Sequence, residues 1–168
     1  IDCAWLSFGS EGRDERTFTT DQDNGIVFIC TDIMDRELTQ LRFLDFARDV
    51  NADLDRCGFP LCKGNIMASN PDLCLTLEEW EDKFAQWVRT PEPQALLNAT
   101  IFFDFRPLYG RFNLAHRLRL ELFRQTRGNP LFLRMLAENA LSVAPPLGRI
   151  RDFVTSTDPE HPGTIDLK

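Results

Sequence analysis

The sequence predicts an α+β fold, in which a small mixed sheet with flanking helices is followed by a helical lobe. Residues 1–8 (IDCAWLSF) are a mostly apolar run that ends at a glycine, which is typical of a buried strand. Residues 35–57 carry apolar side chains three and four positions apart, the spacing of an amphipathic helix. Two more runs with helical spacing, 113–127 and 130–143, follow in the second half of the chain and predict the helical lobe.

Two further strands are expected on either side of the long helix at 35–57. Both are short runs of strand-forming residues next to turn signals, and they span 26–31 and 61–68. Gly58 and Pro60 end the helix between them, because neither residue continues a helix well. The order strand, strand, helix, strand gives the first part of the chain its sheet.

The helix that follows the third predicted strand has a clear start. Thr76 and Glu79 have the spacing of a capping box, in which each side chain accepts a hydrogen bond from the backbone N–H of the other. Pro91 stops this helix. Trp80 and Trp87 lie on its apolar face, where we expect them to belong to the core.

A glycine–serine turn and two carboxylates follow the first strand. Gly9 has no side chain, so a phosphate can approach the backbone closely there. Backbone N–H groups of the turn, the Ser10 hydroxyl and the Arg13 guanidinium can donate to anionic oxygens. Asp21 and Asp23 are two residues apart, so on an extended backbone both carboxylates point to one face and can share a pair of Mg²⁺ ions. Two such ions about 3.5–4 Å apart hold a triphosphate and activate an attacking hydroxyl.

These motifs carry a resemblance. A strand, a Gly-Ser turn and an Asp-x-Asp pair resemble the DNA polymerase beta-like nucleotidyltransferase superfamily. The string AWLSFGSEGRDERTFTTDQDNGIVF is similar to the nucleotidyltransferase domain found beside CBS and cyclic-nucleotide-binding domains. That branch is similar to the PII-protein uridylyltransferases and the glutamine synthetase adenylyltransferases. The likeness extends over nearly the whole chain, through the strings CGF, GNIMASNP, FFDFRPLYG and PPLG.

The resemblance implies a nucleotidyltransferase-type sheet and the metal-dependent transfer of a nucleoside monophosphate from an NTP to an acceptor hydroxyl. Asp21 and Asp23 would be the catalytic metal ligands, and Gly9, Ser10 and Arg13 would hold the β and γ phosphates. A protein acceptor is implied, in a signalling or regulatory setting, with CBS or cyclic-nucleotide-binding domains in the full-length chain.

The superfamily uses a third acid, normally on a later strand, and the sequence leaves two candidates for it. Asp166 lies in an apolar–acid–apolar pattern that suits a strand. Asp104 lies in the better-matched string FFDFRPLYG, where Arg106 is close enough in sequence to pair with it as a structural ion pair. The resemblance of its string favours Asp104 as the third catalytic acid.

Two departures from the superfamily pattern keep other functions open. Gln22 and Asn24 are polar at positions where the inner face of the strand is normally apolar. The predicted strand at 61–68 carries Asn65 and no carboxylate. A regulatory module that senses a nucleotide without turning it over is therefore the alternative, and a degenerate domain kept as an interaction surface is a third possibility.

The resemblance also guides the domain division. Residues 93–108 have helical spacing although 100–105 is β-prone, and we expect a helix because the counterparts in the related families look helical. The chain then divides into a nucleotidyltransferase core at 1–90 and a helical substrate-binding lobe at 91–168. Because the chain begins without Met inside a predicted strand, we expect both units to be truncated parts of a longer polypeptide.

Composition excludes several partners. The net charge of −7 argues against a nucleic acid, whose phosphates reward clusters of Lys and Arg. No apolar run approaches the roughly 20 residues that span a bilayer, so no membrane contact is expected. The five cysteines form no C-x-x-C pair, and Cys57 is expected on the apolar face of the long helix. Buried free thiols of this kind suggest a reducing, cytoplasmic setting.

Overall fold

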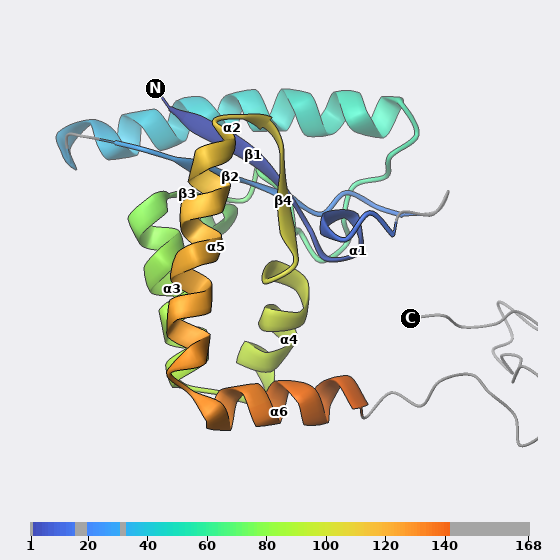
Figure 1. Cartoon of the computed structure of the whole chain (residues 1–168). Helices are drawn as coiled ribbons and strands as arrows, with labels where there is room; N and C mark the ends of the chain where they lie inside the picture. The colour runs from blue at the N-terminus through green and yellow to red at the C-terminus, as the bar shows by residue number, and fades with distance from the viewer. Residues whose placement is uncertain (1, 16–19, 31–32, 142–168) are drawn as a thin grey trace, which may run out of the picture.

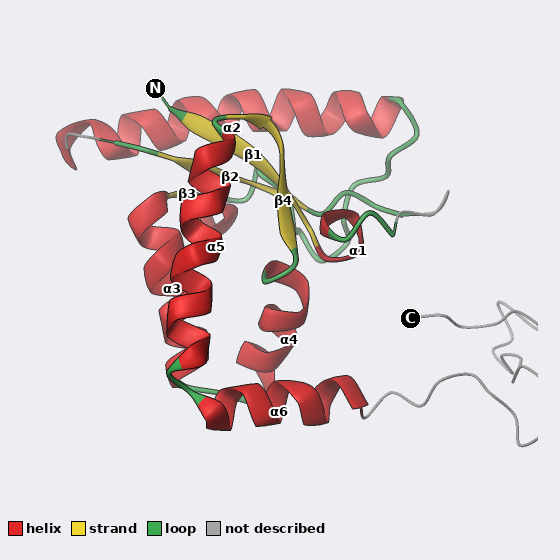
Figure 2. Cartoon of the chain, in the orientation of Figure 1, coloured by secondary structure: helices red, strands yellow, loops and turns green. Residues whose placement is uncertain are grey.

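The computed structural model describes residues 2–15, 20–30 and 33–141, and it has the predicted α+β fold. Figures 1 and 2 show a small sheet with helices on both of its faces. The sheet is mixed: β1 pairs antiparallel with both β2 and β4, whereas β2 pairs parallel with β3, in the order β3-β2-β1-β4. The strands are β1 (Cys3–Phe8), β2 (Asn24–Phe28), β3 (Cys74–Thr76) and β4 (Phe105–Gly110).

One face of the sheet is covered by the long helix α2 (Ile33–Arg56), which runs across it in Figure 1. Ile26 and Phe28 of β2 point to this face and pack against Leu44 and Ala47 of α2 in one buried cluster. The predicted helix at 35–57 is therefore confirmed. Its apolar spacing buries one side of the helix on the sheet.

The other face packs against α3 (Leu77–Arg89) and α5 (Phe112–Arg127), and α4 (Pro93–Phe102) completes this layer. Side chains of β1 alternate into it, and large aromatic rings fill the space between strands and helices. The fully buried members of this core include Phe8, Trp80, Phe84, Phe105 and Leu118. Burial of each such side chain stabilises the fold by about 1.5–3 kcal/mol.

The helical part of the chain ends with α6 (Pro130–Leu141), which crosses the far ends of α3 and α4 in Figure 1. Its Phe132 is fully buried in a small cluster with Val88, Leu96 and Ala99. The helix predicted at 113–127 is confirmed, and so is the one at 130–143 as far as residue 141, where the described part of the chain stops. No helix among the described residues has both the length and the apolar character that crossing a bilayer requires.

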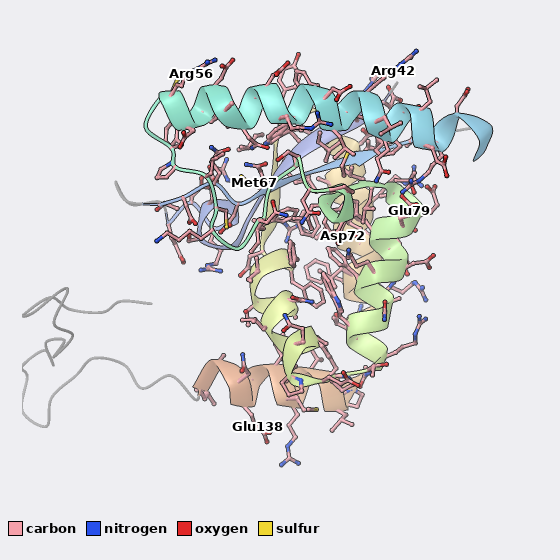
Figure 3. The ribbon with its side chains drawn as sticks, turned by 180° about the vertical axis from the view of Figure 1, so that it is seen from behind. Arg42, Arg56, Met67, Asp72, Glu79 and Glu138 are labelled. Atoms are coloured by element: carbon pink, nitrogen blue, oxygen red, sulfur yellow. The ribbon has the colours of Figure 1, made fainter. Side chains whose placement is uncertain are left out.

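The capping box at the start of α3 is present as predicted. Thr76 Oγ1 accepts from Glu79 N at 3.2 Å, and Glu79 Oε2 accepts from Thr76 N at 2.9 Å. Glu79 also forms an ion pair with Arg36 of α2, with Arg36 Nη2 and Glu79 Oε1 2.7 Å apart. Figure 3 labels Glu79 at the α2 end of α3, so this one carboxylate joins a helix start on one face to the helix covering the other.

The strand predicted at 61–68 is wrong. The segment and the proline before it touch the chain at 22–24 through two backbone hydrogen bonds, from Gln22 N to Pro60 O and from Asn24 N to Ile66 O. Between them it forms a turn instead of a ladder, because Asn65 adopts the left-handed conformation with φ 57°. The third strand is the short β3, which follows a 3₁₀ turn at Pro71–Leu73.

The helix predicted at 93–108 is correct only in its first part. α4 ends at Phe102, and Phe105–Gly110 forms β4 along the free edge of β1. Pro107 is compatible with this strand because an edge strand has an unpaired side where no backbone N–H is needed. The second strand is also shifted: it spans Asn24–Phe28 and not 26–31.

The fourth strand bears on the domain division. β4 lies beyond residue 90, yet it pairs with β1 at the centre of the sheet. The sheet is therefore built from both of the units that the sequence suggested, and the boundary near residue 90 stays a prediction.

Candidate functional site

The glycine–serine turn lies beside the Asp-x-Asp segment. β1 ends at Phe8, and the chain turns through the single-turn helix α1 (Gly9–Gly12). Gly9 has φ +56°, a conformation that favours glycine. Phe8 N donates to Asp23 O at 2.9 Å, and a Cβ placed on Gly9 would lie 3.9 Å from Asp23 Oδ2. The predicted phosphate-binding turn and one of the predicted metal ligands therefore meet at one place.

The two carboxylates are close together, and a thiol joins them. Asp21, Asp23 and Cys62 each offer a ligand atom, and these atoms all lie within 4.8 Å of one another. All three residues are partly buried. Among the described residues this is the group of three that is compact enough to hold a metal ion. Two carboxylates fit a divalent cation, since Mg²⁺ and similar ions prefer oxygen ligands.

The polar residues between the carboxylates have a structural role. Gln22 and Asn24 are buried on the α2 side, where Asn51 Nδ2 donates to Gln22 Oε1 at 2.7 Å and to Asn24 Oδ1 at 3.1 Å. Gln22 Nε2 donates to the carbonyl oxygens of Asn51 and Phe59, and Ala68 N donates to Asn24 Oδ1. This amide network replaces the apolar contacts expected of an inner strand face, and it fixes the carboxylates on the opposite side.

Cys62 was not predicted as a site residue. Burial raises the pKa of its thiol to about 11, and the hydrogen bond to the Asp23 carboxylate acts in the same direction. The backbone N–H groups of Gly64 and Ile66 donate to Sγ and oppose that rise. The available signal was the turn-forming Lys63-Gly64-Asn65 directly after the cysteine, which argues against a strand and for a loop that returns to the site.

Arg13 is engaged within the protein. Its Nη1 lies 2.7 Å from Asp104 Oδ2 and its Nε lies 2.8 Å from Glu15 Oε2. The hydrogen bond with Asp104, and then the one with Glu15, raises the pKa of the Arg13 guanidinium. The side chain remains 40% exposed, so it is accessible to a ligand.

The two candidate third acids have different outcomes. Asp104 precedes β4 and pairs with Arg13; it does not join the group formed by Asp21, Asp23 and Cys62. The expected pairing of Asp104 with Arg106 is wrong: Arg106 bonds instead to Asp14 and to the backbone oxygen of Glu11. Asp166 lies outside the described residues.

A close backbone contact positions this pairing. A Cβ on Gly12 would lie 2.1 Å from the backbone oxygen of Asp104, so α1 packs directly against the chain between α4 and β4. Only glycine permits this approach. It brings Arg13, the next residue, within reach of the Asp104 side chain.

The four other cysteines do not belong to the group formed by Asp21, Asp23 and Cys62. All five cysteines are free thiols, but the predicted burial holds only for Cys74, since Cys3, Cys30 and Cys62 are partly buried and Cys57 is exposed. Cys57 is exposed just past the end of α2, which corrects the expected position on the apolar face of that helix. Cys74 is buried beneath α2, and burial raises the pKa of its thiol to about 12.

Comparison with known proteins identifies the family. Residues 1–94 match the family model described as “Putative nucleotidyltransferase DUF294”, and residues 130–168 match “Putative nucleotidyltransferase substrate binding domain”. The first match includes the Gly-Ser turn, both carboxylates and Cys62. No curated protein and no solved structure matches the chain significantly. The first match covers more than half of the chain, and the chain therefore belongs to the DUF294 nucleotidyltransferase family.

Proposed function

We propose that this protein transfers a nucleoside monophosphate from an NTP to a hydroxyl group in a metal-dependent reaction that releases pyrophosphate. The observation that carries the proposal is the contact between the Gly9 turn and Asp23, 3.9 Å from a Cβ on Gly9 to Oδ2. This proximity supports the proposal, because a glycine turn suits phosphate and a pair of carboxylates suits divalent cations. That combination is what a metal-bound triphosphate requires.

Each predicted residue has a role in this scheme. Asp21 and Asp23 would hold the cations, for which the sequence predicts two Mg²⁺ ions, and the turn at Gly9 and Ser10 would receive the phosphates. Bound divalent cations would neutralise the triphosphate and activate the acceptor hydroxyl. Most of the rate enhancement would come from positioning and from charge neutralisation.

Arg13 and Asp104 are proposed to act together. In the described structure they form an ion pair with Nη1 and Oδ2 2.7 Å apart. A triphosphate at the turn would compete with Asp104 for the Arg13 guanidinium, because phosphate oxygens bind arginine strongly. Asp104 released in this way would be available as the third catalytic acid.

The acceptor and setting follow from the resemblance described above. We propose a hydroxyl on a protein as the acceptor and regulatory CBS or cyclic-nucleotide-binding domains as partners within a longer chain. The net charge of −7 supports a partner other than a nucleic acid. Five free thiols support a cytoplasmic location.

Pyrophosphate release tests the proposal. The protein is incubated with each of the four NTPs, Mg²⁺ or Mn²⁺ and candidate acceptor proteins, and pyrophosphate is measured. Asp23→Asn should lower turnover at least about a hundredfold, because it removes a metal ligand whose charge the transition state needs. Asp45→Asn, on the exposed side of α2, is the matched control and should be unchanged. Absence of metal-dependent turnover with every NTP and acceptor contradicts the proposal.

A nucleotide sensor is the second candidate, and one observation favours it. The third member of the compact group is the thiol of Cys62, where an active transferase would be expected to have a carboxylate. Calorimetry separates the two functions. Metal-dependent binding of an NTP without any pyrophosphate release supports the sensor, whereas release with turnover supports the transferase.

A further inference from the structure

We propose that Cys62 is a ligand of the cation held by Asp21 and Asp23, and that the site therefore prefers a borderline divalent cation such as Co²⁺ or Zn²⁺ to Mg²⁺. The proposal deepens the proposed function and rests on it only in taking the carboxylate pair as the metal site. Its first support is geometric: Cys62 Sγ lies within 4.8 Å of a carboxylate oxygen of both Asp21 and Asp23. Bonds from a metal to oxygen or sulfur are about 2.0–2.3 Å long, which puts neighbouring ligand atoms of one ion roughly 3–4 Å apart, so small side-chain movements bring these three atoms onto one ion.

The surroundings of the sulfur are compatible with this role. The backbone N–H groups of Gly64 and Ile66 lower the pKa of the Cys62 thiol, against the larger effect of burial. Backbone donors near a sulfur stabilise negative charge on it.

The loop is also shaped to hold the sulfur in place. Asn65 N donates to Cys62 O at 3.0 Å, and Asn65 itself lies in the left-handed region with φ 57°. Asn70 Nδ2 donates to Asn65 O at 3.0 Å, which holds the turn from its far side. Backbone bonds from Gln22 and Asn24 fasten both ends of the loop to the Asp-x-Asp segment. The thiol and the carboxylates are therefore parts of one braced unit.

The donor set decides the metal preference. Mg²⁺ demands oxygen ligands in near-ideal octahedral geometry, whereas thiolate sulfur favours softer cations. When the cation binds, the S–H bond of Cys62 breaks, a sulfur–metal bond forms and the proton leaves to solvent. A site made of two carboxylates and one thiolate should bind Co²⁺ or Zn²⁺ more tightly than a site of carboxylates alone.

Titration with Co²⁺ in the absence of nucleotide tests the proposal directly. The wild-type protein should develop a thiolate-to-Co²⁺ charge-transfer absorption that saturates at one equivalent. Cys62→Ser should abolish this absorption and weaken Co²⁺ binding at least about tenfold. Cys57→Ser is the matched control: it alters the nearest exposed cysteine in sequence and should leave both readouts unchanged.

Two further measurements keep the test valid if Cys62→Ser does not fold. Cys62→Asp, which makes the ligand set all oxygen, should raise the affinity for Mg²⁺ relative to Co²⁺. In the wild-type protein, Co²⁺ should slow the alkylation of Cys62 but not of Cys57, as measured on the separated peptides, and this readout does not depend on the folding of any variant.

Failure of this proposal is distinct from failure of the proposed function. Co²⁺ binding without the absorption and without protection of Cys62 overturns the thiolate ligand, even if NTP turnover with Mg²⁺ is normal. The absorption and the protection together support the ligand, even if no NTP is ever turned over. No binding of Co²⁺ at the carboxylate pair also overturns it.

Discussion

At the level of single residues, buried amide side chains hold the Asp-x-Asp segment in position. Asn51 of α2 donates to both Gln22 and Asn24, while the Asp23 carboxylate lies beside Gly9 and close to that of Asp21. Hydrogen bonds inside a protein have defined directions, so this network fixes the backbone of the segment more narrowly than apolar contacts would. The carboxylates are thereby kept close before any cation binds.

Replacing the central amide tests this positioning. Asn51 is 2% exposed, and Asn51→Leu removes both donors while nearly keeping the volume. We expect the free energy of unfolding to fall by about 1–3 kcal/mol, because buried acceptors lose their partners. Affinity for Mn²⁺ should fall as well. Urea unfolding and calorimetry measure the two effects, with the exposed Asn113→Leu as control. Unchanged metal affinity would show that the network does not position the site.

The pKa of Cys62 gives a prediction about pH. A thiol whose pKa is raised to about 11 is almost fully protonated at pH 7, and its thiolate fraction grows about tenfold with each pH unit below 11. Alkylation of Cys62 by iodoacetamide in the metal-free protein should therefore be slow at pH 7 and still rise between pH 8 and pH 10. Peptide mass spectrometry measures the rate. A rate that levels off below pH 9 would contradict the burial of this thiol.

Sequence reasoning found the residues that belong to short motifs and missed those that arrive by folding. Asp21, Asp23 and Gly9 lie in one string, and their chemistry is evident from residue type and spacing. Cys62 and Asn51 reach the same place from a loop and a helix 27 or more residues away. Contacts of that kind depend on how the loop after α2 folds back, which no local pattern states.

At the level of elements, the junction of α1 with β4 joins the two ends of the candidate site. Gly12 packs on the backbone of Asp104, and the neighbouring Arg13 binds the Asp104 side chain. The turn that is proposed to receive phosphates is thus attached to the residue proposed as the third acid.

A methyl group on Gly12 should push α1 away from the backbone of Asp104. In Gly12→Ala the new Cβ would meet the backbone oxygen of Asp104 at 2.1 Å, a contact that backbone movement must relieve. We expect a loss of about 1–3 kcal/mol in the free energy of unfolding. Gly128→Ala is the control, because its Cβ would have no neighbour closer than 3.6 Å, and it should change stability by less than about 1 kcal/mol. Equal stability of Gly12→Ala and wild type would refute the close packing.

The incorrectly predicted elements have tertiary causes. Residues 105–108 suit a helix by their spacing, but the free edge of β1 offers unpaired backbone groups, and pairing there outweighs local preference. Residues 61–68 form no ladder with a neighbouring strand; within them only Ile66 accepts a backbone hydrogen bond from the segment at 22–24. The helices were predicted well because apolar spacing over three or more turns is a local signal.

On the scale of the whole molecule, elements from both sides of residue 90 share one sheet and one buried cluster. β4 pairs with β1, and Leu114 and Leu118 of α5 belong to the same buried cluster as Ala4, Leu6 and Phe8. The division at residue 90 therefore cuts through a shared sheet and a shared core.

Two fragments of the chain test whether the shared sheet and core unfold as one cooperative unit. Residues 1–90 alone lack β4 and α5, so one edge of β1 loses its partner strand and one face keeps only the cover that α3 provides. We expect this fragment to show no cooperative urea transition, whereas residues 1–141, which include every described element, should unfold cooperatively. Circular dichroism measures both transitions. A cooperative transition of 1–90 close to that of the longer chain would support two independent units instead.

The central claim is that the Gly9–Ser10 turn and the carboxylates of Asp21 and Asp23 form one site for a metal-bound nucleotide. A crystal structure of the protein with Mn²⁺ and a non-hydrolysable NTP analogue, using the anomalous signal of manganese, is the most direct test. The account predicts an anomalous peak between the carboxylates of Asp21 and Asp23, with the triphosphate lying over the Gly9–Ser10 turn. A nucleotide bound elsewhere, or manganese bound away from both carboxylates, would contradict it.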